Sequence, residues 1–146
     1  MTGATQNLDQ SQNQPASAVF RRRHKLAGGD FAPVFQARLR KSRGPITVHM
    51  RPNGLAEHRL GLSIGRKLGG AIRRNKFKRQ IREVFRFHRA SLPFPTGDGG
   101  YDIVVSARAH EPLGYEQCRD WFMEAVQAAH RVHEKRHSEP AEPGDG

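Results

Sequence analysis

The segment from Arg66 to Arg89 constrains the fold of this chain more than any other, because it is helix-forming, apolar on one side and almost without acids. It carries ten basic residues and one acid, Glu83. At about 100° per residue, its apolar side chains Phe77, Ile81, Val84 and Phe85 gather on one face, together with His88. The flank beside that face is cationic: Arg74, Asn75, Lys78, Arg79, Arg82, Arg86 and Arg89. The pattern predicts a helix over 71–90 that packs on a sheet and leaves one side positive.

The charges of this helix lack the partners that a solvated surface helix has. Such a helix pairs Lys and Arg with acids at i,i+4, and Glu83 is the only acid available. Like charges therefore destabilise the free protein, and a phosphate backbone would neutralise them with release of counterions. Arg predominates over Lys, and its planar fork suits phosphate contacts and stacking on bases. We interpret the flank as a nucleic-acid-binding surface.

The charge of the whole chain supports this interpretation. The 146 residues include 25 Lys and Arg against 14 Asp and Glu, a net charge of +11. Residues 20–90 hold 20 basic and 3 acidic side chains (+17), residues 91–146 hold 5 and 10 (−5), and Asp9 adds −1. A solubilising surface normally mixes both signs, so the one-sided excess favours a polyanionic partner. A membrane-surface or calmodulin-binding helix is disfavoured, because the apolar face is committed to a core.

The remaining apolar patterns predict a sheet covered by helices. Alternating or bounded apolar runs predict three strands: 46–51, 59–64 and 101–107. Asp30 can cap a short helix with three apolar residues on one face: Phe31, Val34 and Phe35. A last helix over 115–134 carries an apolar stripe: Tyr115, Cys118, Phe122, Ala125, Val126 and Ala129. This order of elements indicates an α+β fold, one sheet with helices packed on it.

Both ends of the chain lack the apolar residues of a core. Residues 1–18 and 137–146 are expected to be disordered tails around one domain at 19–136. Cys118 is the only cysteine, which excludes an internal disulfide and a Cys-rich zinc site. No apolar run approaches the roughly 18 residues of a membrane span, and the polar N-terminus lacks the apolar stretch of a signal peptide. We expect a soluble, cytoplasmic protein.

No catalytic constellation is visible in the sequence. The acids are scattered, without a pair spaced for two-metal phosphodiester chemistry. His130, His133 and His137 could share a helix face as metal ligands, but solvated histidines are the expected state near a fraying helix end. We therefore predict no catalytic residue and no metal ion bound by the protein itself.

The run from Gly61 to Glu83, GLSIGRKLGGAIRRNKFKRQIRE, resembles the signature of the protein subunit of bacterial ribonuclease P. In that family a GLSVSKKxGNAVxRNRxKRxxRE pattern joins a strand to a basic helix. An upstream motif, Asp30-Phe31-x-x-Val34-Phe35, and a downstream motif, YDIVVSAR at 101–108, occupy the family's places. The resemblance covers about residues 20–130. Three motifs in order at this spacing are far more specific than a basic helix alone.

The resemblance implies a four-stranded sheet with a left-handed βαβ crossover, against the general right-handed preference. It also implies that the basic helix faces a catalytic RNA subunit, and that the sheet and first helix form a cleft for the single-stranded 5′ leader of precursor tRNA. RNA contacts are then expected from Ser63, Arg66, Lys67, Arg73, Arg74, Asn75, Lys76, Lys78, Arg79, Arg82 and Arg86. Phe31 and Phe35 match the aromatic cleft residues, which stack on unpaired bases, and core packing of the same rings is an equal expectation. His49 stands where members often carry a cleft tyrosine.

By the same resemblance, the RNA subunit binds Mg²⁺ and performs the hydrolysis, while the protein raises affinity for precursor over mature tRNA. The chain departs from the family at Lys76, where the third residue of the RNR motif is arginine, and at Gly65, where a serine is common. Only three of the four strands can be placed.

Three other functions are compatible with parts of the pattern. A ribosomal or other structured-RNA-binding protein on a similar fold is the first. A protein-only nuclease is disfavoured by the missing carboxylate cluster. A reader of duplex DNA needs a helix that projects freely into a groove, whereas this helix is packed along its length.

Overall fold

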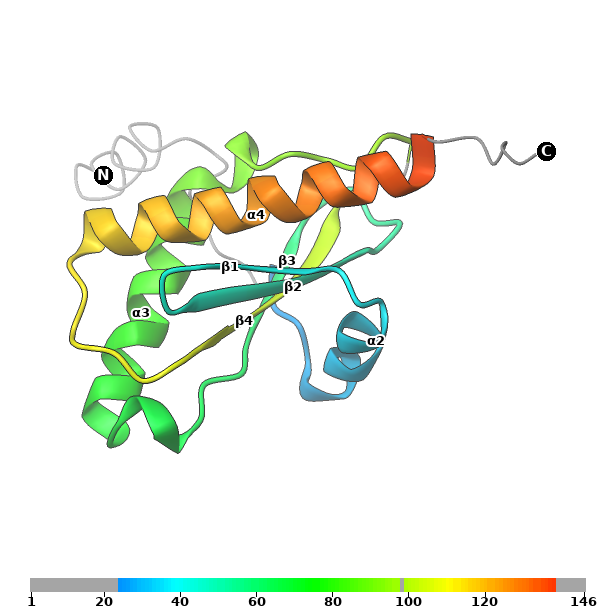
Figure 1. Ribbon diagram of the computed structural model, residues 1–146. Coiled ribbons are helices and arrows are strands. Elements are labelled where there is room, and N and C mark those ends of the chain that lie inside the picture. Colours follow the sequence, from blue (N-terminus) through cyan, green and yellow to red (C-terminus); the bar gives the residue numbers. More distant parts are fainter. Residues whose placement is uncertain (1–23, 98, 139–146) are drawn as a thin grey trace, which may run out of the picture.

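A single mixed sheet lies at the centre of the computed structural model, which describes residues 24–97 and 99–138 (Figure 1). Its strands follow the order β1-β2-β4-β3. They comprise β1 (Arg40–Arg43), β2 (Ile46–Pro52), β3 (Arg59–Leu62) and β4 (Tyr101–Ala107). β1 and β4 pair antiparallel with β2, whereas β3 runs parallel to β4.

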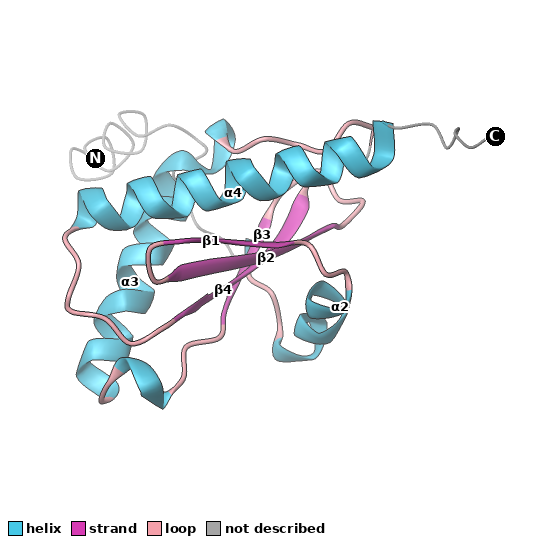
Figure 2. Ribbon diagram, viewed as in Figure 1, coloured by secondary structure: helices cyan, strands magenta, loops and turns pink. Residues whose placement is uncertain are grey.

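Helices cover both faces of this sheet (Figure 2). The two long helices, α3 (Ala71–His88) and α4 (Tyr115–Ser138), pack on one face, and the short α2 (Phe31–Gln36) packs on the other. Single 3-10 turns lie at Gly28–Asp30, Arg66–Leu68 and Arg89–Ser91. The predicted α+β fold is confirmed. Because α3 joins β3 to its parallel neighbour β4, the expected βαβ unit is present, and its left-handed sense stays a prediction.

Successive side chains of a strand point to opposite faces of the sheet. The alternation of apolar residues along each strand therefore determines which face packs against the long helices and which against α2. Ile46, Val48 and Met50 of β2 are fully buried against α3 and α4, as the alternation predicts. On β4, Val104 points the other way and packs with Val34 of α2. The α2 face is otherwise largely polar. It is therefore a surface with a small apolar centre and not a second full core.

The strand that the sequence did not place is β1, in the basic run after α2. Three of its four residues are exposed and the fourth is half-buried, so no apolar alternation marks it. It pairs with β2 across a tight turn at Gly44, whose φ is +56°. A Cβ at Gly44 would lie 2.5 Å from the indole of Trp121, so α4 also requires glycine there. An edge strand that is solvated on its outer side leaves little hydrophobic signal.

Several predicted ends and contacts are wrong. β3 ends at Leu62 and not at 64, and α4 continues past 134 to Ser138, into the first two residues of the predicted tail. Glu134 accepts hydrogen bonds from the Thr96 backbone N–H (3.0 Å) and hydroxyl (2.6 Å), which holds this end of α4. Tyr115, predicted in the buried stripe, is 37 % exposed. The remainder of the C-terminal tail, 139–146, and the predicted N-terminal tail lie outside the described residues.

Asp30 does not cap α2 with its side chain. Its carboxylate lies 3.9 Å from the Arg59 guanidinium instead. The helix start is held from the preceding 3-10 turn, where the Asp30 N–H donates to the carbonyl of Ala27 at 2.9 Å. The arginine opposite thus competes with the cap for this carboxylate.

The histidines near the end of α4 were expected to be solvated, and this expectation is wrong for at least two of them. His133 is only 5 % exposed, and the His130 Nδ1 lies 2.8 Å from the Tyr101 hydroxyl. The ring of His137 lies 4.1 Å from that of His133. Within 24–97 and 99–138, no three His, Cys, Asp or Glu side chains are grouped as a metal site requires. No helix in these ranges is long and apolar enough to cross a membrane.

Candidate nucleic-acid interface

Helix α3 presents its cations from a firmly anchored position. Phe77, Ile81, Val84 and Phe85 are buried in the main core, whereas His88 at the same face is half-buried. The apolar stripe fixes the rotation of the helix, so the basic residues beside it must face solvent. Ser63, Arg66 and Lys67, in the segment that leads into α3, are exposed as well.

Besides Arg73, five cations of α3 form no ion pair with any acid in the described part of the chain: Arg74, Lys76, Lys78, Arg79 and Arg82. Arg74 is half-buried, and its Nε has no hydrogen-bond partner among the described atoms. Asn75 is exposed between them. The expected unneutralised flank is therefore present on the first three turns of α3 at Arg74, Lys78, Arg79 and Arg82, and we call these four residues the α3 cation cluster. Lys76 falls outside that flank and lines a pocket toward the loop between β4 and α4.

The C-terminal end of α3 is different, because carboxylates reach its arginines. The Arg86 Nη2 donates to both oxygens of Glu83, at 2.5 and 2.7 Å. Arg89 lies 3.4 Å from a carboxylate oxygen of Glu57. The guanidinium of Arg86 also lies over the Phe87 ring, 4.2 Å from its centroid. Arg86 therefore offers a phosphate less free charge than the cluster does.

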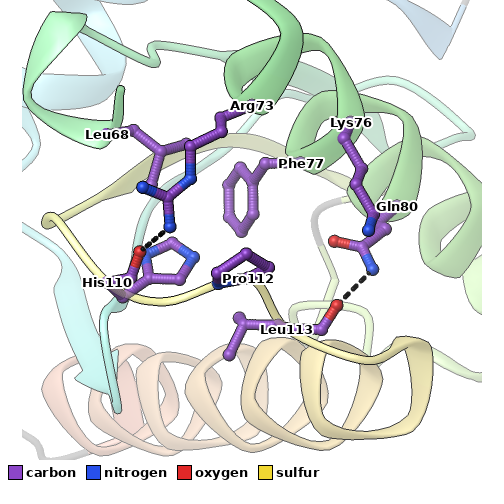
Figure 3. Close-up of a pocket in the computed structure, with 8 residues that line it drawn as sticks. All are labelled: Leu68, Arg73, Lys76, Phe77, Gln80, His110, Pro112 and Leu113. Atoms are coloured by element: carbon purple, nitrogen blue, oxygen red, sulfur yellow. Dashed lines mark hydrogen bonds between the residues drawn. The ribbon is translucent and has the colours of Figure 1, made fainter. Parts of the chain in front are cut away.

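Arg73 has a structural partner that the sequence did not indicate (Figure 3). Its Nη2 donates to the carbonyl of His110 at 2.8 Å, and the Gln80 amide donates to the carbonyl of Leu113 at 2.6 Å. Phe77 meets the His110 ring edge-on, with centroids 5.5 Å apart. The pocket between them holds about 30 Å³, room for about one water molecule. This side of α3 fastens the loop between β4 and α4, and Arg73 faces that loop.

On the opposite face of the sheet, the predicted cleft residues lie where α2 packs on the strands. The Phe31 ring lies directly on Gly61, where a Cβ would come within 2.5 Å of the ring. Phe35 is 39 % exposed and meets the His49 ring edge-on, with centroids 4.7 Å apart. Phe31 and Phe35 meet edge-on at 6.4 Å. The three predicted cleft residues are thus brought together, with an open ring at one end and a packed ring at the other.

His49 lies on the cleft floor in a setting that favours its neutral form. Burial, and secondarily the positive charge of Arg40, lower the pKa of His49. Its Nε2 is 3.5 Å from the Ser106 hydroxyl. A neutral imidazole beside an exposed aromatic ring can stack on a base without requiring a counter-ion.

A buried acid that sequence reasoning missed lies on the same sheet face, two residues from Val104 on β4. Asp102 is fully buried, and the Arg59 Nε and Nη2 donate to its two oxygens at 2.8 Å each. The Asn53 amide donates to the same carboxylate at 2.9 Å, and Arg51 lies 3.7 Å away. The hydrogen bond to Asp102 raises the pKa of Arg59. An acid directly before the apolar run 103–105 was the available signal.

The cation cluster and the cleft meet at a pocket of about 130 Å³. Lys78 and Arg82 line it from α3, Phe31 from α2 and Gly61 from β3. Lys25, which was not predicted, lines it as well. The two surfaces expected from separate motifs therefore form one continuous surface around the β3 edge of the sheet.

Comparison with known proteins decides the family. A family model described as Ribonuclease P matches residues 20–130. The chain belongs to the ribonuclease P protein family. The ribonuclease P protein component of Chromobacterium violaceum is 42 % identical over 91 residues, 61 % of this chain and 70 % of that protein. That of Thermotoga maritima is 37 % identical over 103 residues, 70 % and 84 % of the two chains.

Solved ribonuclease P proteins share the fold. The Staphylococcus aureus protein superposes with a TM-score of 0.60 at 27 % identity, covering 73 % of this chain and 94 % of that one. The Thermotoga maritima protein gives 0.59 at 32 % identity, covering 73 % and 96 %. The three motifs predicted a protein component of the tRNA-processing endoribonuclease, and this prediction is confirmed. The alternative prediction, a ribosomal protein on a similar fold, is not supported by these comparisons.

Proposed function

We propose that this ribonuclease P protein binds the catalytic RNA subunit through the α3 cation cluster and holds the 5′ leader of precursor tRNA in the cleft under α2. It acts in the cytoplasm as the non-catalytic part of the enzyme. Mg²⁺ bound by the RNA supplies the hydrolytic chemistry, and the protein neutralises phosphates where two RNAs approach each other.

One observation carries this proposal: the α3 cations, unpaired among the described residues, meet the Phe31 end of the aromatic cleft at a pocket that Lys78 and Arg82 line. A folded RNA presents a dense phosphate backbone, which such cations neutralise. A single strand presents unstacked bases, which aromatic rings bind with little sequence preference. The two halves of the surface therefore suit the two forms of RNA, and they lie next to each other.

Reconstitution with the catalytic RNA of the same organism tests the proposal. At low Mg²⁺ concentration, we expect the protein to stimulate cleavage of leader-bearing tRNA, because it replaces part of the charge screening that Mg²⁺ provides. The protein without RNA should not cleave. Cleavage by the protein alone, or an unchanged rate when it is added to the RNA, would overturn the assignment.

A further inference from the structure

A row of residues crosses the sheet beneath α2 and continues past it. Gly61 of β3 pairs with Val104 of β4, Val104 pairs with His49 of β2, and His49 pairs with Arg40 of β1. Residues paired across neighbouring strands point to the same face, and Val104 identifies that face by packing with Val34 of α2. Three strand spacings make the row about 14 Å long.

Helix α2 covers the middle of this row and leaves its β1 end open. Phe31 lies on Gly61, and Phe35 meets His49. α2 packs mainly on β2 and β4, so Arg40 on the outer strand lies beyond it. Arg40 is exposed and forms no ion pair with an acid of the described residues. The row therefore begins at the pocket beside α3 and ends at a free cation.

The strand that carries Arg40 is itself a cationic edge. No acid occurs between Asp30 and Glu57. Four basic residues stand at or beside β1 in this interval: Arg38, Arg40, Lys41 and Arg43. The charge of Arg40 is felt inside the cleft, because it helps to lower the pKa of His49. An unpaired cation at the end of an aromatic cleft is placed to bind a phosphate of a strand that leaves the cleft.

We propose that Arg40 binds a backbone phosphate of the 5′ leader where the leader leaves the cleft across β1. This inference rests on the proposed function. It also gives the leader a direction. The Phe31 end of the row borders the α3 cation cluster and hence the RNA subunit, so nucleotides near the cleavage site lie there. More distant nucleotides pass His49 and then Arg40.

The adjacent residue provides a matched control. Lys41 has the same charge, is also exposed and lies on the same strand. It pairs with Val48, which is fully buried in the core on the α3 and α4 side, so its side chain points to the opposite face. Replacing Lys41 removes one charge from β1 without touching the row.

The experiment measures binding of precursor tRNA to the assembled enzyme with leaders of about 4 and about 12 nucleotides. Arg40→Ala should weaken binding of the long leader about threefold to tenfold and leave the short leader unchanged. The slope of log affinity against log salt should fall by about 0.7 for the long leader, the value for one phosphate of a single strand. Lys41→Ala should change neither leader selectively, and Arg40→Lys should keep most of the long-leader affinity.

Equal losses for the two leader lengths, or equal effects of Arg40→Ala and Lys41→Ala, would overturn the inference. Thermal unfolding of each variant checks that the fold is kept. Failure of the proposed function has a different result: the unaltered protein would then give the enzyme no preference for leader-bearing over mature tRNA at either length. A kept preference that is insensitive to Arg40 rejects the exit site alone.

Discussion

Phe31 and Phe35 lie one turn apart on α2, but their surroundings differ. Phe31 packs with the buried residues Leu26, Val34 and Val104 and lies against Gly61. Phe35 is 39 % exposed and touches His49 by an edge contact, which leaves ring surface open. Core packing and base stacking were equal expectations for both rings. The structure gives Phe31 the contacts of a core residue and Phe35 those of a stacking platform.

Phe35→Ala should therefore separate leader binding from stability better than Phe31→Ala. Loss of one stacked base costs about 1–3 kcal/mol, so affinity for leader-bearing tRNA should fall about fivefold or more, with little change for mature tRNA. The thermal midpoint should move little because the ring is exposed. Phe31→Ala should lower the midpoint as well, since it removes a packed ring. Competition binding measures the affinities for leader-bearing and mature tRNA, and calorimetry measures the thermal midpoint.

Phe87→Ala is the matched control for Phe35→Ala. Phe87 is 43 % exposed and lies on α3, away from the cleft. If both substitutions changed the preference for precursor over mature tRNA equally, Phe35 would not be a leader contact.

At the scale of elements, α3 was the best-predicted part of the chain, because one period explains both of its sides. The stripe that fixes its rotation is strongly apolar, so its buried residues and its free cations followed from the sequence together. The partners of each individual cation could not be predicted from the sequence. Glu83 reaches Arg86, and Arg73 reaches a carbonyl 37 residues away. Contacts of that kind depend on how loops and turns bring distant residues together.

The edge strand β1 was missed for a related physical reason. A strand with one partner and a solvated outer side needs few apolar residues, and RKSR has none. The far end of α4 was missed because its support, the contact of Glu134 with Thr96, is tertiary. The cleft residues could be named only through the family motifs. The row that these residues form across the four strands depends on how the strands are paired in register. The apolar patterns of the three predicted strands do not specify that register.

The α3 cation cluster makes a prediction at this scale. Arg74→Ala with Arg79→Ala should weaken binding of the catalytic RNA about tenfold or more and reduce the salt slope by about 2, roughly one per lost phosphate contact. Arg131→Ala with Lys135→Ala removes the same charge from exposed positions of α4 and should have a much smaller effect. Equal slopes for the two double variants would assign the binding to net charge and not to α3. Filter binding over a range of salt concentrations provides the slopes.

At the scale of the whole molecule, His58 joins the β2–β3 loop to two segments that follow about 36 and 43 residues later, at Phe94 and Tyr101. Its ring is fully buried, stacks on Phe94 at 4.1 Å and accepts a hydrogen bond from the Tyr101 N–H at 2.9 Å. Burial, and then the charges of Arg89 and His130, lower the pKa of His58 to about 4. The His58 imidazole thus connects the end of the β2–β3 loop with the segment after α3 and with the start of β4. These contacts require the imidazole to be neutral.

The free energy of unfolding should therefore depend on pH between about 6.5 and 4. Over this window the unfolded chain binds a proton at His58 and the folded chain does not, so stability is complete above the unfolded pKa and falls as the pH drops. The shift from 6.5 to about 4 corresponds to a loss of about 3 kcal/mol. His58→Asn keeps an acceptor for the Tyr101 N–H but does not titrate, so its unfolding free energy should change much less across the window. His49, whose pKa is also lowered, leaves the variant a residual slope of the same sign. Denaturant unfolding at several pH values measures both slopes, and identical slopes would show that the buried imidazole is not the group responsible.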